Sequence, residues 1–151
     1  MEKNIVKYQR LRLVFLIFFI IFEGFAIGGI LLYFVFFDKD IHYAIIPFLI
    51  ILLFSIVLLV FLKVDDFCGD KIIVNVIEII KNNLKASDLP IKFEMITNDS
   101  ELVFSITNLN YQEIFEKAFE TIDSIVSSNK VKNDISGSIF IYLAGRKLPL
   151  Y

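Results

Sequence analysis

The chain has 151 residues, of which 57% are hydrophobic and 15% aromatic, with a net charge of −2. Ordinary soluble domains are roughly 45–50% apolar, so this composition argues against a plain soluble enzyme. The one cysteine excludes an intrachain disulfide and a CxxC site, and the one histidine, His42, excludes His-rich zinc sites. The nearly balanced charge implies no strongly basic surface for duplex nucleic acid.

Two apolar runs near the N-terminus predict a transmembrane hairpin. Residues 13–37 and 44–62 would form helices about 37 Å and about 28 Å long, against a hydrocarbon core of about 30 Å. Residues 38–43 are expected to form a tight connecting loop, with Tyr33 and Tyr43 as anchors near one membrane interface. We therefore assign residues 1–63 to an N-terminal transmembrane hairpin and residues 64–151 to a soluble domain.

The distribution of Lys and Arg predicts the orientation of this hairpin. Four cations precede the first run, one lies between the runs and Lys63 and Lys71 follow the second. The positive-inside rule then places both termini and the C-terminal domain in the cytoplasm, in a multi-pass protein of the inner (plasma) membrane. In that compartment the sequon Asn98-Asp99-Ser100 is not glycosylated, and we interpret it as a hairpin turn. Cys68, just past the second run, is either palmitoylated or, as we favour, an unreactive buried thiol.

Glu23 interrupts the first apolar run near its middle. An acidic side chain there costs at least about 2.5 kcal/mol and normally faces protein or water. Gly24 and Gly28 follow in a GxxxG spacing, which lets helices approach closely, so this broad face is expected to contact another helix. Two interpretations stay open: Glu23 is a packing residue hydrogen-bonded to Ser55 of the second run, or it lines the axis of a homo-oligomeric pore.

Residues 64–151 predict a small α+β domain with the order α-β-β-α-β. Asp70 is expected to cap a helix over 71–86, two strands around 91–95 and 102–106 form a hairpin, and 139–143 form a third strand. A capping box from Asn110 to Glu113 predicts a second helix to about residue 128. The expected core positions on the two helices are Ile72, Ile73, Val76, Ile77, Ile80, Leu84, Phe115, Ala118, Phe119, Ile122, Ile125 and Val126.

Residue patterns typical of catalysis are absent from the sequence. It contains no GxxxxGK[ST], GxGxxG, HExxH or GxSxG motif. Asp65, Asp66 and Asp70 could hold Mg²⁺, but acids next to a membrane are usually solvated. We therefore predict no catalytic residue, no metal site and no cofactor, and we do not expect an enzyme.

The polar segments at the two ends of the last strand suggest an anion site. Ser136-Gly137-Ser138 precedes this strand and Ala144-Gly145-Arg146-Lys147 follows it, offering backbone amides, hydroxyls and cations. The candidate ligand-binding residues are Arg146, Lys147, Ser138 and Lys92. For each residue taken singly we favour the alternative that it binds no ligand. The nearby glycines would then serve only the turns, and the cations would be solvated or touch lipid phosphates. In a tetramer, Arg146 would form a ring of charge able to bind a small cyclic or polyphosphate ligand.

The order of a two-span hairpin and a small cytosolic domain resembles the small membrane effectors of type III CRISPR systems, which carry a cytosolic domain for cyclic oligoadenylate. The resemblance is one of length and domain order, and no binding residue is carried over from it. It implies a homo-oligomer that reads a cyclic nucleotide and impairs the membrane in antiviral defence.

Three functions are therefore weighed. The first is an oligomeric membrane effector that binds a small anionic signal, such as a cyclic oligoadenylate, and then perturbs or permeabilises the membrane. The second is a membrane-anchored accessory or scaffold subunit whose cytosolic domain docks a protein partner. The third is a transporter or holin-like subunit with a regulatory soluble domain. The expected partners are membrane lipids, further copies of the chain and a small nucleotide ligand.

Overall fold

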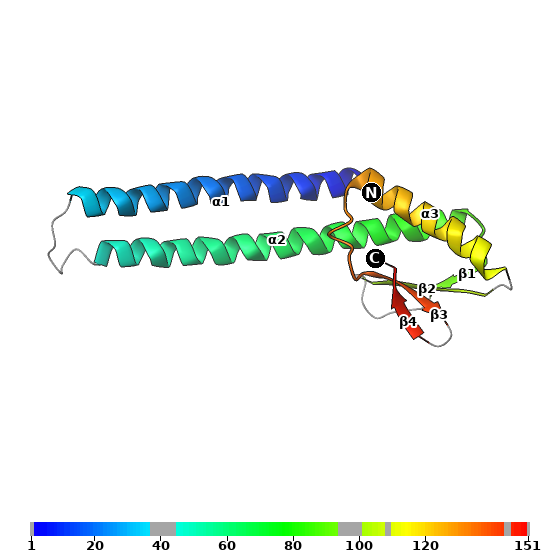
Figure 1. Ribbon diagram of the computed structural model, residues 1–151. Helices are drawn as coiled ribbons and strands as arrows, with labels where there is room; N and C mark the ends of the chain where they lie inside the picture. Colours follow the sequence, from blue (N-terminus) through cyan, green and yellow to red (C-terminus); the bar gives the residue numbers. More distant parts are fainter. Residues whose placement is uncertain (1, 37–44, 94–100, 108–109, 144–145, 151) are drawn as a thin grey trace. The chain divides into compact units, whose positions relative to one another are not determined.

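The computed structural model describes residues 2–36, 45–93, 101–107, 110–143 and 146–150. Its elements are α1 (Glu2–Phe36), α2 (Ile45–Ala86), β1 (Ile91–Phe93), β2 (Leu102–Ile106), α3 (Tyr111–Asn129), β3 (Ile139–Leu143) and β4 (Arg146–Pro149) (Figure 1). The predicted α+β class is confirmed. The chain divides into two compact units: a helical unit, Gln9–Cys68, and an α+β unit, Met1–Tyr8 with Gly69–Tyr151.

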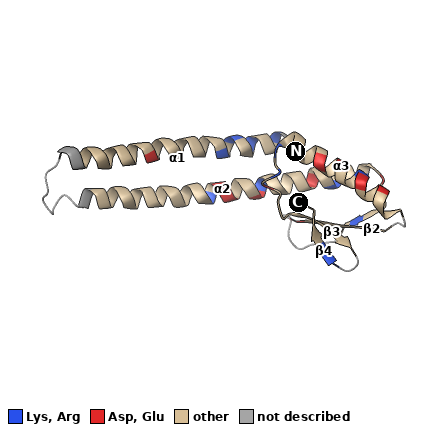
Figure 2. Cartoon of the chain, viewed as in Figure 1, with Lys and Arg blue, Asp and Glu red and all other residues tan. Residues whose placement is uncertain are grey.

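The helical unit consists of parts of two long apolar helices. The stretches Lys3–Tyr33 of α1 and Pro47–Ala86 of α2 are long and apolar enough to cross a membrane. Lys and Arg gather near the start of α1, whereas charged side chains are sparse along the apolar stretches (Figure 2). Both predicted spans fall largely on these helices, and the predicted loop 38–43 lies outside the described residues.

Within the helical unit, α1 contacts α2 in the antiparallel sense. The ring of Phe19 stacks on Phe61 at a centroid distance of 4.8 Å and lies 5.9 Å from Phe54. Nearer the start of α1, the guanidinium of Arg12 donates two hydrogen bonds to the carboxylate of Asp65. Aromatic packing and one ion pair therefore join the two helices.

The predicted helix break at Asp70 is wrong, because α2 runs without interruption from Ile45 to Ala86. Apolar residues recur at four-residue intervals through Cys68, Ile72 and Val76, and all three are fully buried. This stripe continues across Asp70, and a new helix start there would leave several backbone N–H groups without partners. The predicted helix end is confirmed: Asp88 follows it with a left-handed φ of 52°.

The sheet has four strands in the order β1-β2-β3-β4. β1 and β2 form the predicted antiparallel hairpin, and β3, the predicted third strand, is parallel to β2 with α3 as the crossover. The turn 98–100 and Met95 lie outside the described residues. The expectation of three strands is wrong, because Arg146–Pro149 forms β4, antiparallel to β3. Such a short, exposed strand containing Lys and Pro is typical of a sheet edge, and it lacks the apolar alternation that predicts a strand.

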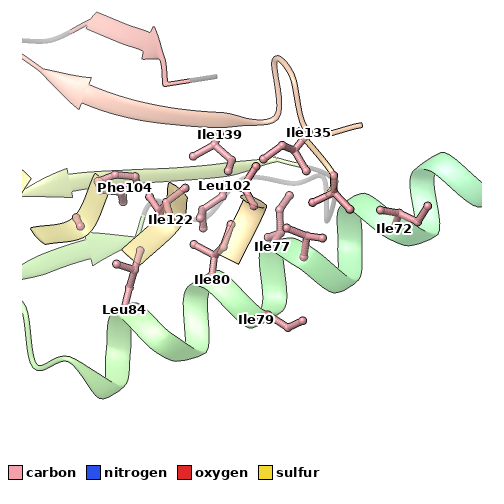
Figure 3. Close-up of a cluster of buried hydrophobic side chains, with 14 of the residues drawn as sticks. Ile72, Ile77, Ile79, Ile80, Leu84, Leu102, Phe104, Ile122, Ile135 and Ile139 are labelled. Carbon is pink, nitrogen blue, oxygen red and sulfur yellow. The ribbon is translucent and has the colours of Figure 1, made fainter. Parts of the chain in front are cut away.

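The core of the α+β unit lies between one face of the sheet and the two helices. Phe104 on β2 is fully buried and packs in a cluster with Leu84 of α2, Ile122 of α3 and Ile139 of β3 (Figure 3). The expected α2 positions are confirmed as buried or partly buried core residues. On α3, the prediction that Phe119 is a core residue is wrong. Phe119 is 38% exposed, whereas Ile114, which was not predicted, is buried.

The start of α3 is confirmed, but its capping box is not. The side chain of Asn110 makes no capping hydrogen bond. The carboxylate of Glu113 instead accepts a hydrogen bond from the Lys117 amine one turn later, at 2.6 Å. A side chain engaged in this i,i+4 pair does not reach back to the helix start.

Three of the buried core residues lie outside the helices and strands predicted for the α+β domain. Ile5, near the start of α1, is fully buried in the cluster of the α+β unit. Val131 and Ile135, in the turns between α3 and β3, are also fully buried, although that stretch reads as a polar connection. The α+β unit thus includes the first turns of α1, in addition to the residues expected after the hairpin.

Candidate functional site

The strand register brings two of the four predicted ligand residues into one row. Lys92 pairs with Ser105, Ser105 with Tyr142, and Tyr142 with Lys147. Directly paired residues of neighbouring strands lie on the same face of a sheet. This row, called here the lysine row, lies on the face opposite to Phe104 and Ile141, because successive residues of a strand alternate between faces.

The lysine row presents two amines, a hydroxyl and an aromatic ring. Lys92 is exposed, and no hydrogen bond or ion pair joins its amine to another residue in the described ranges. Tyr142 is 44% exposed. The Lys147 amine lies 2.6 Å from an oxygen of Glu101 and 3.9 Å from the centroid of the Phe140 ring, so it is held in place. With strands about 4.8 Å apart, three strand spacings separate Lys92 from Lys147 by about 14 Å.

The other two predicted ligand residues do not join this row. Arg146 pairs with Leu143 at the exposed start of β4, and it precedes Lys147, so its side chain lies on the opposite face. Ser138 is buried: its backbone N–H donates to the Ile135 carbonyl and its carbonyl accepts from the Leu102 N–H. Ser138 therefore serves the junction between the turns and β3. Ala144 and Gly145 lie outside the described residues.

A second polar region, not predicted from the sequence, lies beside the turns that precede β3. It is a hollow of about 400 Å³ lined by Phe119, Asp123, Lys132, Asn133, Ser136 and Leu150. The buried side chains of Val131 and Ile135 anchor the turns, and their neighbours Lys132, Asn133 and Ser136 are exposed. The apolar spacing of Val131 and Ile135 is the signal that could have revealed these turns as an ordered wall.

Glu23 lies in the apolar part of α1 and is half-buried. Its carboxylate makes no hydrogen bond or ion pair with any residue that the structure describes. The bond to Ser55, which belonged to one of the two interpretations, is absent: the Ser55 hydroxyl donates to the Ile51 carbonyl of its own helix at 2.9 Å. A Cβ added at Gly24 or Gly28 would meet open space, so neither glycine serves a close helix contact within this chain.

The acids and the cysteine after the second apolar run have structural surroundings. Asp65 pairs with Arg12, and among the described residues no three potential ligands come together around a metal position. Cys68 is buried, as expected, and burial together with the nearby Asp65 carboxylate raises the pKa of its thiol. A buried thiol with a raised pKa is a poor nucleophile.

Comparison of the chain with known protein families, with curated proteins and with solved structures finds no match.

Proposed function

We propose that this chain is an oligomeric membrane effector whose α+β unit, in the cytoplasm, binds a small anionic signal. Its two apolar helices then form a transmembrane hairpin that permeabilises the inner membrane. The supporting observation is that both membrane-length helices contribute residues to the α+β core: Ile5 from α1, and Ile72 and its successors from α2. We propose that a rearrangement of this core on ligand binding therefore moves residues that belong to the same two helices.

The lysine row indicates the kind of signal. The backbones of Lys92 and Lys147 are about 14 Å apart, so the two amines suit a ligand with more than one anionic group, and such a ligand would compete with Glu101 for Lys147. Tyr142 lies between them, and an exposed aromatic ring on a sheet is a stacking platform for a nucleobase. A small cyclic oligonucleotide, such as a cyclic oligoadenylate, carries several phosphates and bases. The proposed role in antiviral defence rests on this ligand class together with the resemblance in domain order to the CRISPR membrane effectors.

The surroundings of Glu23 favour assembly of several copies. An acidic side chain in lipid without a partner costs at least about 2.5 kcal/mol, and this cost is removed when the group meets protein or water. Gly24 and Gly28 leave room for a second helix on this part of α1. In the proposed tetramer, copies of α1 meet along this face.

Flux from liposomes containing the full chain tests the proposal. Cyclic oligoadenylates should increase dye or ion release, Lys92→Ala should reduce the response about tenfold or more, and Glu23→Gln should change the ligand-induced flux. Lys117→Ala, which removes a lysine of α3 paired with Glu113, is the matched control and should respond normally. Flux that no nucleotide changes would refute the effector function.

The scaffold function remains the second candidate because of an aromatic row on α3. Tyr111, Phe115 and Phe119 follow one another at one-turn intervals, with ring centroids 5.9 Å and 6.1 Å apart. Of the three, Phe119 is exposed, whereas Tyr111 and Phe115 are partly buried against the core. Aromatic residues are enriched where proteins meet. A chain that stays monomeric in detergent and assembles only with another protein, losing that partner in Phe119→Ala, would favour the scaffold.

A further inference from the structure

The amine of Lys147 is held at one point of the sheet face opposite to Phe104. It lies 2.6 Å from a carboxylate oxygen of Glu101 and 3.9 Å from the centroid of the Phe140 ring. Lys147 itself pairs with Tyr142, which lies two residues after Phe140 on β3, so its amine reaches from its own row toward Phe140. The ion pair with Glu101, which directly precedes β2, therefore keeps the amine over the Phe140 ring.

β3 carries two aromatic rings on this face of the sheet. Phe140 and Tyr142 are two residues apart on the strand, which places them on the same face with their Cα atoms about 7 Å apart. Tyr142 is exposed, whereas Phe140 is half-buried and has the Lys147 ammonium group over its ring. Unstacked bases of single-stranded nucleotides stack on successive aromatic rings of a sheet. When Lys147 moves aside, Phe140 becomes a second platform next to Tyr142.

The contact between Glu101 and Lys147 is one that a ligand can open. The two side chains are 32% and 38% exposed, and ion pairs that reach solvent contribute little to stability. A ligand phosphate can replace the carboxylate at the Lys147 amine, but Glu101 then stays nearby and repels it. A ligand with one base and one phosphate gains little from this exchange, whereas two linked nucleotides also gain the second ring. Glu101 thus discriminates against mononucleotides.

We propose that Glu101 determines the ligand specificity of the lysine row. It is a latch that holds Lys147 over Phe140, and a ligand of at least two linked nucleotides opens it. In the open state one base stacks on Tyr142 and the next on Phe140, and phosphates lie at the amines of Lys92 and Lys147. This inference rests on the nucleotide ligand of the proposed function and is independent of membrane permeabilisation.

Calorimetric titration of the full chain in detergent with AMP and with linear 5′-phosphorylated diadenylate tests the latch. The wild type should bind diadenylate about tenfold or more tightly than AMP. Glu101→Gln should tighten diadenylate binding by about threefold to tenfold, because the neutral amide neither holds Lys147 nor repels phosphate. Phe140→Leu, which keeps an apolar side chain, should weaken diadenylate binding by about fivefold or more and AMP binding by less than about twofold.

Glu113→Gln is the matched control for the latch. It removes a carboxylate that pairs with Lys117 on α3 at the same distance of 2.6 Å, and it should leave both affinities unchanged. A merely structural role of the pair between Glu101 and Lys147 would give a lower Tm in Glu101→Gln without tighter diadenylate binding. The gain in affinity therefore separates the latch from a structural ion pair.

Other results would overturn the proposal. Unchanged or weaker diadenylate binding in Glu101→Gln, with an intact thermal transition, would refute the latch, and equal wild-type affinity for AMP and diadenylate would refute the second platform. If neither wild type nor Glu101→Gln binds any nucleotide, both this inference and the ligand class of the proposed function fail. Tighter diadenylate binding in Glu101→Gln, together with liposome flux that no nucleotide changes, would support the latch and refute the effector function.

Discussion

The burial of Ile5 predicts that the start of α1 stabilises the α+β unit. Ile5 is fully buried in the core cluster of that unit, beside residues of α2 and the sheet. Replacing it with alanine removes three carbon atoms, worth about 2.4 kcal/mol at about 0.8 kcal/mol per methylene. Any cavity left behind adds to this, and buried Ile→Ala changes cost about 2–5 kcal/mol in general. For a unit of this size each kcal/mol lowers Tm by about 4–8 °C, so Ile5→Ala should lower it by about 10–20 °C.

Thermal unfolding of the full chain in detergent, followed by tyrosine fluorescence, measures this effect. Val6→Ala is the matched control, because Val6 is adjacent on α1 and 41% exposed, and it should lower Tm by about 2 °C or less. Ile5→Val should give an intermediate loss, since it removes one methyl group. If Ile5→Ala has the same Tm as the wild type, or if Val6→Ala lowers Tm as much as Ile5→Ala does, then the first turns of α1 do not belong to this core. The same reasoning predicts that a fragment of residues 64–151 alone is less stable than the unit within the full chain.

Three further changes test other contacts. Phe104→Ala, at a fully buried position, should destabilise the α+β unit by about 3–5 kcal/mol and remove most of its thermal transition. The hydrogen bond between Glu113 and Lys117 lowers the pKa of Glu113 and raises that of Lys117, so the pair stabilises α3 between the two ordinary pKa values. Lys117→Ala should therefore lower Tm slightly near pH 7 and have no effect at about pH 2, where Glu113 is protonated. Arg12→Ala should lower the thermal stability of the helical unit by about 1 kcal/mol or less, and a charge swap with Asp65 should restore it; failure of the swap would mean that the pair adds no stability.

The helices could be predicted where the periodic spacing of apolar residues matches the buried face of the helix. The apolar face from Ile72 to Leu84 and the end of α2 near Ser87 could be predicted because burial and a left-handed residue after the helix leave clear traces. The break at Asp70 was predicted wrongly because a good capping residue is not sufficient to start a helix. The preceding turn already continued the same buried stripe through Cys68.

The errors in α3 and β4 have a different cause. On α3, the buried face is rotated by about one residue from the predicted face, so Ile114 is buried in place of Phe119. Both residues are hydrophobic, and hydrophobicity alone cannot decide which of them is buried. β4 was missed because an edge strand is held by backbone hydrogen bonds to β3, and its side chains, Arg146 and Lys147 among them, remain exposed. Backbone pairing of this kind leaves little trace in the side chains.

The lysine row shows why a site of this type is hidden in the sequence. Lys92 and Lys147 are far apart in the chain and come to lie in one row only through three successive strand pairings. A slip of one residue in β1 would move Lys92 to the face of Phe104, where the apolar core would exclude its charge. On the other face Phe104 is buried and Phe93 packs against the same core, and this packing fixes the register that aligns the lysines. The same strand register determines both the core packing and the alignment of the candidate site. A core substitution that shifts β1 should therefore weaken ligand binding at Lys92 even though Lys92 itself is unchanged.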